Sequence, residues 1–210
     1  MSSEIVILGA GGHAKVVHEC ILAEGRAKPI AFTDTSGQLG LTMFGLPIVA
    51  EGFLHTEEGR RALFIIGFGG NLMARKAAFE FLTGSGRSAH TVIHPSAILS
   101  SSVSIGEGTV VFPRVIVNPD TKIGLNVILN SGCIVEHDCV VGDHTHIAPG
   151  AILTGGVAIG ECTLVGAGSV VLPGCRVGSN SIVGSGAVVT RDIGDGVVAV
   201  GNPARVIRSM

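Results

Sequence analysis

The chain lacks tryptophan and tyrosine altogether, which removes the usual aromatic anchors for a stacked base or sugar ring. It also lacks any run of basic residues: 14 lysines and arginines stand against 16 aspartates and glutamates, for a formal net charge of −2. Nucleic-acid binding requires concentrated positive charge. We therefore expect no nucleic-acid partner.

Long hydrophobic runs are missing too, although the mean hydropathy is +0.57. Glycines, charges and polar residues interrupt every apolar stretch before the roughly 18 residues that a membrane span needs. The first residues also lack the basic start, apolar run and small-residue cleavage site of a secretory signal. We expect no membrane partner and a cytoplasmic location.

The five cysteines form no C-x-x-C pair, and their odd number fits neither a disulfide framework nor a closed zinc site. Three of them, Cys133, Cys139 and Cys175, occupy the small-residue position of a repeat described next. We expect these three to be buried structural residues without chemistry of their own.

A six-residue repeat fills the second half of the chain. Every sixth residue from Ile93 to Val189 is Ile, Leu or Val, and the residue four places after each, from Ala97 to Ala187, is small or β-branched. Neither the period of two of a strand nor the 3.6 of a helix produces this pattern, whereas a hexapeptide parallel β-helix does. We predict stacked triangular coils, each made of three hexads.

One set of glycines follows the length of a whole coil. Gly106, Gly124, Gly142, Gly160 and Gly178 recur every eighteen residues, so they mark one repeated corner. We expect a positive φ at that corner, a backbone conformation that glycine adopts without steric cost.

The segment before the repeat predicts a small Rossmann-like α/β domain with a parallel sheet. Pro95 favours an extended residue before it and marks the boundary. We divide the chain into a Rossmann-like domain at 1–92, a β-helix at 93–194 and a C-terminal cap at 195–210. In the first of these we expect strands at 5–8, 30–33, 47–50, 63–66 and 89–93 and helices at 13–24 and 71–82.

Gly9 to Ala14 reads G-x-G-x-x-A, follows a strand, and precedes Asp34 by about twenty residues. This spacing fits a dinucleotide-binding turn, although about ninety residues are too few for both halves of that fold. It also fits a loop that holds one diphosphate at a helix N-terminus, with Asp34 on a base or ribose. A turn kept only for strand-to-helix packing is the third interpretation. A second glycine loop precedes Arg75, which is either a phosphate ligand or a solvated arginine.

A cluster of polar side chains interrupts the repeat, which does not itself require them: Glu136, His137, Asp138, His144 and His146. A histidine beside a carboxylate is the minimum for general-base catalysis near neutral pH. Gly155 comes one coil after His137 and should lie beside it. His146 comes half a coil after His137 and should project from another face, so a shared site needs a second subunit. Surface histidines without a role are the alternative.

Together these residues resemble bacterial nucleotide-amino-sugar N-acetyltransferases, the family of bacillosamine and perosamine acetyltransferases, with the related sialic acid O-acetyltransferases. The hexapeptide pattern is common to many acyltransferases, and its combination with the N-terminal glycine loop is more specific. The resemblance rests on Leu8 to Val17 (LGAGGHAKVV), Ile66-Gly67 with Asn71 and Arg75, Asn130 to Asp138 (NSGCIVEHD), His146 to Gly150, and Gly201 to Arg205 (GNPAR).

The resemblance implies a homotrimer of left-handed β-helices, with acetyl-CoA as cosubstrate between neighbouring prisms and no metal. It implies transfer of the acetyl group to the amine of a UDP- or GDP-linked sugar used in polysaccharide biosynthesis. It implies His137 as the base and Asp138, where several relatives carry glutamate, as its partner. The other implied contacts are His146 and Gly155 for acetyl-CoA, and Gly11, Gly12, His13, Asp34, Asn71, Asn130 and Glu136 for the substrate.

Three other functions remain open on the sequence. The first is O-acetylation of a sialic acid by the same fold. The second is a zinc enzyme like the gamma-class carbonic anhydrases, which also use a trimeric left-handed β-helix and interface histidines. The third is a non-catalytic nucleotide-sugar binding protein in which the β-helix is only a scaffold.

Overall fold

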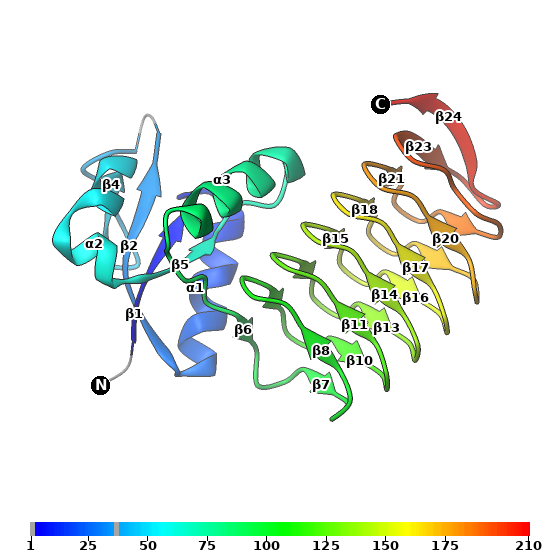
Figure 1. Cartoon of the computed structure of the whole chain (residues 1–210), viewed down its shortest axis with the longest axis horizontal. Helices are drawn as coiled ribbons and strands as arrows, with labels where there is room; N and C mark the ends of the chain where they lie inside the picture. The colour runs from blue at the N-terminus through cyan, green and yellow to red at the C-terminus, as the bar shows by residue number, and fades with distance from the viewer. Residues whose placement is uncertain (1–2, 36–37) are drawn as a thin grey trace. The chain divides into compact units, whose positions relative to one another are not determined.

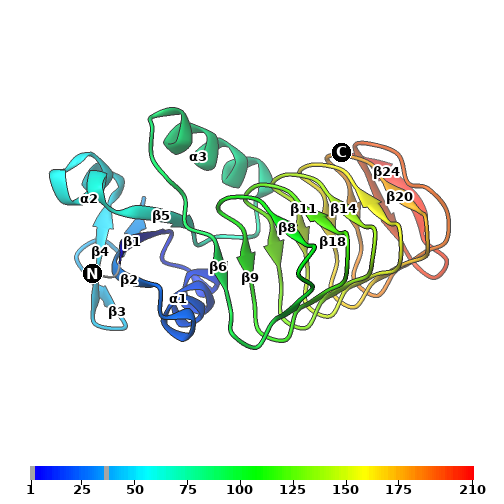
Figure 2. The same cartoon turned by 60° about the horizontal axis from the view of Figure 1, so that its bottom comes forward.

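The computed structural model describes residues 3–35 and 38–210. The chain divides between Pro95 and Ser96 into two compact units. The first unit is an α/β sandwich, and the second is a stack of coils (Figures 1 and 2). None of the helices in the described part of the chain is long and apolar enough to cross a membrane.

The first unit is built on a five-stranded sheet in the order β3-β4-β2-β1-β5. Its neighbours run parallel except in the β3–β4 hairpin, which is antiparallel. The strands are β1 (Ser3–Leu8), β2 (Ala27–Asp34), β3 (Thr42–Met43), β4 (Leu46–Ala50) and β5 (Leu63–Ile66). The remaining elements are α1 (Gly12–Glu24), the 3-10 helix η1 (Glu51–His55), α2 (Glu57–Arg61), α3 (Leu72–Gly84) and β6 (Val92–Ile93).

Burial explains β1, an interior strand of this sheet. The apolar run of β1 from Ile5 to Leu8 is buried, as expected of a parallel strand covered on both faces. The side chains of Phe64 on β5 and Phe79 on α3 pack in the same core with their ring centroids 6.0 Å apart. Because β1 and β2 are parallel, the glycine loop and Asp34 emerge at one edge of the sheet.

The expected helices and most of the expected strands are confirmed, with bounds that shift by a few residues. Three elements were not expected: β3, η1 and α2. The expected parallel sheet is confirmed, and β3 adds an antiparallel edge to it through a tight hairpin at Phe44 (φ 52) and Gly45 (φ 76). The expected strand at 89–93 is reduced to β6 and an isolated bridge between Ala89 and Phe64.

The second unit consists of short strands, of two residues each up to β22, that form three sheets. The first sheet contains β7 (Ile98–Leu99), β10 (Ile116–Val117), β13 (Ile134–Val135), β16 (Ile152–Leu153), β19 (Val170–Val171) and β22 (Val188–Val189). The second contains β8 (Ser104–Ile105), β11 (Lys122–Ile123), β14 (Val140–Val141), β17 (Ala158–Ile159) and β20 (Arg176–Val177). The third contains β9 (Val110–Val111), β12 (Ile128–Leu129), β15 (His146–Ile147), β18 (Leu164–Val165), β21 (Ile182–Val183), β23 (Val197–Val200) and β24 (Arg205–Ser209).

From β7 to β22, neighbouring strands of a sheet pair in parallel at a spacing of eighteen residues, as Val117 does with Val135, whereas β23 and β24 at the end of the stack are antiparallel. The second residue of each strand points inward, and from Val111 to Val189 every such residue is buried. The hexapeptide β-helix is therefore confirmed. The small position also joins the coils: the Thr121 hydroxyl donates to the Glu136 carbonyl at 2.8 Å and accepts from the Cys139 N–H at 3.2 Å.

A positive φ was expected at the glycines that recur every eighteen residues. This expectation is wrong, because none of them has a positive φ. They are needed where stacked coils approach each other. A Cβ on Gly124 would lie 2.3 Å from Asp143 Oδ1 and 2.8 Å from the Asp143 nitrogen. The left-handed conformation occurs instead at every sixth residue from Gly108 to Gly186, and Asp138 (φ 59) occupies one of these turn positions.

All five cysteines are buried, and none of them forms a disulfide. Burial raises the pKa of the Cys133 thiol to about 12, so this thiol is not activated. The burial expected for Cys133, Cys139 and Cys175 is confirmed.

Candidate functional site

His137 and Asp138 form the turn between β13 of the first sheet and β14 of the second. Both side chains are exposed, and His137 Nδ1 lies 2.8 Å from Asp138 Oδ2. Because the carboxylate only accepts hydrogen bonds, Nδ1 carries the proton and Nε2 of the neutral ring is an acceptor. The hydrogen bond to Asp138, with smaller help from the charges of Asp138 and Glu136, raises the pKa of His137 above its usual value.

Gly155 lies beside the imidazole, as the coil length predicted. A Cβ on Gly155 would stand 2.7 Å from both Cε1 and Nε2 of His137. Gly155 does not have a positive φ, so its backbone conformation does not require glycine. The neighbouring Gly156 N–H donates to the His137 carbonyl at 2.9 Å and fixes the two coils against each other. The imidazole is therefore packed against bare backbone.

Glu136 lies one residue before the histidine and is half-buried. Its Oε2 accepts a hydrogen bond from Asn118 Nδ2, one coil earlier, at 2.8 Å. This contact holds the Glu136 carboxylate at the edge of the same corner. The structure thus brings Glu136, His137, Asp138 and Gly155 together.

Asn130 and His146 form a separate pair. Asn130 follows β12, and His146 lies on β15, both in the third sheet. The Asn130 Nδ2 lies 3.0 Å from His146 Nε2. Since His137 stands between the first and second sheets, His146 projects from a different face, as predicted.

His144 belongs to neither group. Its side chain is buried, and its Nδ1 lies 3.0 Å from the amide nitrogen of Asn126 one coil earlier. Both residues occupy left-handed turn positions. His144 is thus part of the packing between coils and not of the exposed polar cluster.

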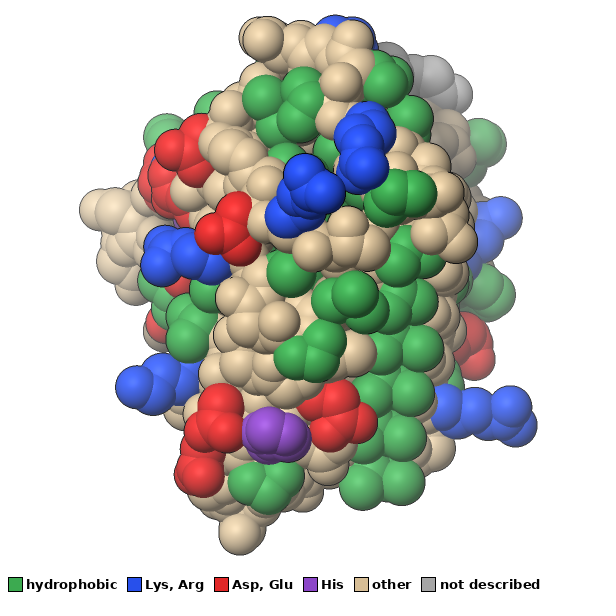
Figure 3. Space-filling view, turned by 90° about the vertical axis from the view of Figure 1, so that its right-hand side faces the viewer, with side chains coloured by type: hydrophobic (Ala, Val, Ile, Leu, Met, Phe, Trp, Pro, Cys, Tyr) green, Lys and Arg blue, Asp and Glu red, His purple; other side chains and the backbone are tan. Residues whose placement is uncertain are grey.

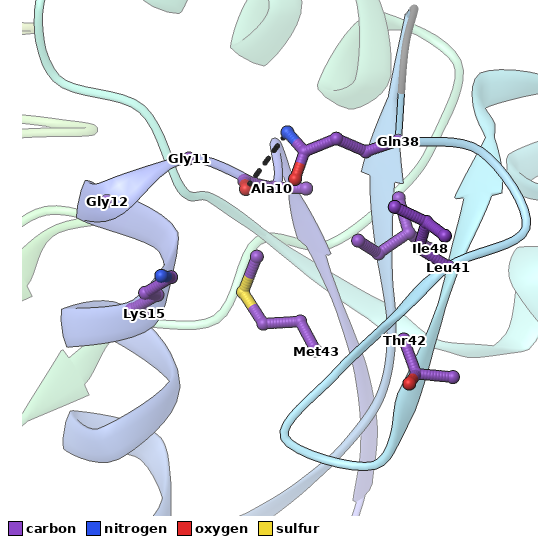
Figure 4. Close-up of a pocket in the computed structure, with 9 residues that line it drawn as sticks. All are labelled: Ala10, Gly11, Gly12, Lys15, Gln38, Leu41, Thr42, Met43 and Ile48. Atoms are coloured by element: carbon purple, nitrogen blue, oxygen red, sulfur yellow. Dashed lines mark hydrogen bonds between the residues drawn. The ribbon is translucent and has the colours of Figure 1, made fainter.

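Two adjoining pockets lie at the carboxyl edge of the sheet in the first unit. The hairpin pocket, of about 410 Å³, is lined by Ala10, Gly11, Gly12, Lys15, Gln38, Leu41, Thr42, Met43 and Ile48 (Figure 4). The strand-end pocket, of about 530 Å³, is lined by Leu8, Gly9, Ala10, Gly11, Thr33, Asp34, Thr35, Gln38, Glu51, Phe68, Ala74 and Ala78. The two share Ala10, Gly11 and Gln38, and the Gln38 amide reaches the Ala10 carbonyl at 3.5 Å.

Glycine occupies the positions of this loop for different physical reasons. Gly9 has φ 101, and a Cβ there would lie 3.2 Å from Phe68 Cδ1, so its role is structural. Gly11 has φ −91, and no described atom lies within 4 Å of a Cβ built on Gly11 or Gly12. Packing of the described chain therefore does not require glycine at these two positions. Bare backbone at the start of α1 leaves room for a ligand to approach.

Asp34 and His13 border this region. Asp34 ends β2, lines the strand-end pocket and accepts a hydrogen bond from the Thr35 N–H at 2.7 Å. His13 is half-buried in the first turn of α1. Glu51 also lines the strand-end pocket, and sequence reasoning missed it because no motif surrounds it.

Asn71 and Arg75 have structural contacts that the sequence did not indicate. Asn71 caps α3, its side chain accepting from the Ala74 N–H at 3.0 Å, and it lines neither pocket. Arg75 is fully buried, donates to the carbonyls of Ile66 and Phe68 at 3.0 and 2.9 Å, and has its pKa lowered by burial to about 9. Both interpretations of Arg75, as phosphate ligand and as solvated arginine, are wrong.

Comparison with known proteins agrees with this geometry. The model described as the PglD N-terminal domain matches residues 4–81, and the model for bacterial transferase hexapeptide repeats matches residues 120–155 and 156–191. The acetyltransferase domain of PglB from Neisseria gonorrhoeae FA1090 is 33% identical with a TM-score of 0.92, over 98% of this chain and 100% of that one. The chain belongs to the nucleotide-amino-sugar N-acetyltransferase family.

Two further members show the spread of this family. PerB from Caulobacter crescentus, solved with CoA and GDP-perosamine, is 37% identical with a TM-score of 0.89 over 98% of both chains. The UDP-N-acetylbacillosamine N-acetyltransferase of Bacillus subtilis (strain 168) is 38% identical over 113 residues, which are 50% of this chain and 49% of that protein. The match therefore spans about half the length of this curated relative.

Family membership confirms the resemblance recognised in the sequence. It does not favour the zinc enzyme or the non-catalytic scaffold. Among the described residues of one chain, no three histidine, cysteine, aspartate or glutamate side chains are grouped as metal ligands would be.

Proposed function

We propose that this member of the family transfers the acetyl group of acetyl-CoA to the amine of a UDP- or GDP-linked amino-deoxy sugar. The observation that carries the proposal is the exposed His137, held by Asp138 through Nδ1 and packed against the backbone of Gly155. This arrangement leaves one basic nitrogen, Nε2, available at a corner where two substrates can meet.

The chemistry follows from these parts. Nε2 of His137 takes a proton from the sugar amine as the amine nitrogen attacks the thioester carbonyl, so a new C–N bond forms. The Gly155 N–H is the donor that we propose for the developing oxyanion. When the tetrahedral intermediate collapses, the C–S bond breaks, and the CoA thiolate takes the proton held by His137. Asp138 stabilises the imidazolium between these two steps.

The relatives support both substrates. The PglB domain has been solved with acetyl coenzyme A, and PerB with CoA and GDP-perosamine. A histidine-to-asparagine variant of perosamine N-acetyltransferase from Caulobacter crescentus has also been solved with CoA and GDP-perosamine, at 36% identity to this chain. In our proposal the two pockets of the first unit hold the nucleotide part, and the His137 corner holds the reacting groups.

We extend the proposal to a homotrimer. The outward residues of the first sheet are all aliphatic, and each is exposed or half-buried: Ile98, Ile116, Ile134, Ile152, Val170 and Val188. The second sheet presents Ser104, Lys122, Val140, Ala158 and Arg176 at the same positions. Figure 3 shows hydrophobic side chains gathered in a column on one face. An apolar stripe of this length favours burial against another copy.

The apolar stripe lies on the sheet from which the chain turns toward His137. His137 begins the turn that leaves the first sheet, so a neighbour packed on that sheet would approach the His137 corner. Such a neighbour could present the His146 and Asn130 pair of its own third sheet to the acetyl-CoA. We place the reaction in the cytoplasm, where acetyl-CoA and nucleotide sugars are available, with its product serving polysaccharide synthesis.

Thiol release from acetyl-CoA tests the proposal, measured with a panel of UDP- and GDP-linked amino sugars. We expect release with at least one amino sugar and none with its N-acetylated form. His137→Ala should lower kcat by about 10²–10⁴ with little change in CoA affinity, whereas the exposed His55→Ala should not. Near-normal turnover by His137→Ala would refute the role of His137, and no release with any amino sugar would favour a binding protein.

A further inference from the structure

Lys15 is a charged residue of the hairpin pocket that the proposed mechanism does not use. It lies in the first turn of α1 and is exposed. Figure 4 shows it on one side of the pocket, with Leu41, Thr42 and Ile48 on the other. Among the described residues, Lys15 is the only charged one that lines this pocket. None of the ion pairs between described residues includes Lys15.

The strand-end pocket has the opposite charge. Its charged lining residues are Asp34 and Glu51, and it has no cationic lining residue among those described. Because the two pockets share Ala10, Gly11 and Gln38, they lie next to each other, and the charge of their lining differs in sign from one to the other.

We propose that Lys15 binds the diphosphate of the nucleotide-linked sugar and that the charge change sets the direction in which the nucleotide lies. This inference rests on the proposed function and deepens it. A diphosphate beside Asp34 and Glu51 would meet two like charges, whereas beside Lys15 it meets an opposite one. The nucleoside hydroxyl and N–H donors then lie against the two carboxylates, which accept hydrogen bonds.

The wall opposite Lys15 strengthens this pairing. Leu41, Met43 and Ile48 give the hairpin pocket a largely apolar lining, beside the hydroxyl of Thr42. An ion pair between Lys15 and a phosphate against an apolar wall is screened less than one in open water.

Calorimetric titration of the full-length protein with nucleoside, nucleoside monophosphate and nucleoside diphosphate tests the inference, with both uracil and guanine as base. Lys15→Met removes the charge and keeps the side-chain length, and Lys15→Arg restores the charge. The exposed Lys28, which lines neither pocket, gives the matched control Lys28→Met. Asp34→Asn probes the adjoining strand-end pocket.

Lys15→Met should weaken the binding of the nucleoside diphosphate by about fivefold to thirtyfold, with a smaller loss for the monophosphate and none for the nucleoside. Lys15→Arg should recover most of the affinity, and Lys28→Met should change nothing. Asp34→Asn should weaken all three ligands by a similar factor. Higher salt should reduce the difference between wild type and Lys15→Met.

An equal loss for nucleoside and diphosphate in Lys15→Met, or no loss for either, overturns the inference. So does the absence of nucleoside diphosphate binding to the wild-type protein. None of these titrations requires acetyl transfer, so the outcome is independent of the thiol-release assay. If the wild-type protein turns over and Lys15→Met binds the diphosphate unchanged, only the role of Lys15 is refuted. If Lys15→Met selectively loses diphosphate affinity but the wild-type protein does not turn over, only the proposed reaction is refuted.

Discussion

Gly155→Ala should reduce catalysis without destabilising the protein. The new Cβ would lie 2.7 Å from Cε1 and Nε2 of His137, whereas ordinary contacts begin at 3.4 Å. The imidazole must therefore move by about 0.7 Å, and it can do so because its side chain is exposed. A displacement of that order at a catalytic group costs up to about 10²-fold in rate. We expect kcat to fall by about 10- to 100-fold, or roughly 1.4–2.7 kcal/mol of activation free energy.

The free energy of unfolding should behave differently. Gly155 has no positive φ, so alanine fits its backbone, and the less flexible unfolded chain stabilises the protein by about 0.4–1 kcal/mol. The melting temperature should thus stay constant or rise while kcat falls.

Steady-state thiol release and thermal unfolding measure the two effects. Gly194→Ala is the matched control, because Gly194 also lies in the second unit, lacks a positive φ, and has no described atom within 4 Å of the position that a Cβ would take. It should leave kcat unchanged. An active Gly155→Ala enzyme, or one that loses activity only because it unfolds, would refute the proposed contact between the imidazole and the backbone of Gly155.

Three other predictions concern titration, assembly and stability. Since Asp138 raises the pKa of His137, the inactive protonated form persists to higher pH; Asp138→Asn should move the acid limb of the kcat/KM profile to lower pH, and an unmoved limb would contradict this. Ile134→Glu should reduce the molar mass measured by light scattering from a trimer to a smaller species, whereas Lys122→Glu on the second sheet should not. The buried Glu24 carboxylate accepts hydrogen bonds from His90 Nε2 and the Ile93 N–H, both at 2.8 Å; Glu24→Gln should cost about 1–3 kcal/mol in the free energy of unfolding. Burial alone raises the pKa of Glu24, but the hydrogen bonds from His90, Arg26 and Ile93 hold it below its usual value. The stabilisation by the ionised Glu24 carboxylate should therefore be lost as the pH falls below about 4, which urea melts at a series of pH values measure. A pH-independent difference between wild type and Glu24→Gln would contradict it.

The β-helix could be predicted because its determinant is local and repeated. Every sixth residue must fill the same interior position, so the period appears directly in the sequence and also places Gly155 beside His137. The reason why a glycine recurs every eighteen residues could not be predicted from the sequence period. The close approach of Gly124 to Asp143 depends on how tightly successive coils stack. The eighteen-residue spacing indicates only that the two residues belong to neighbouring coils.

The first unit was less predictable because its contacts are irregular. Arg75 follows a glycine loop like a phosphate ligand, but its guanidinium is buried and satisfies backbone carbonyls. The β3–β4 hairpin depends on a positive φ at Phe44, whose ring stacks on His18 at 4.6 Å. Neither contact has a local signature. The opposite charges of Lys15 and Glu51 in two adjoining pockets likewise emerge only when the chain is folded.

The mass and chemical stability of the product test the central claim most directly. After complete turnover with acetyl-CoA, the nucleotide-linked amino sugar should gain the mass of one acetyl group for each free thiol released, and the gain should survive hydroxylamine, which removes O-acetyl groups. An unchanged sugar, or an acetyl group that hydroxylamine removes, would contradict amine acetylation at the His137 corner.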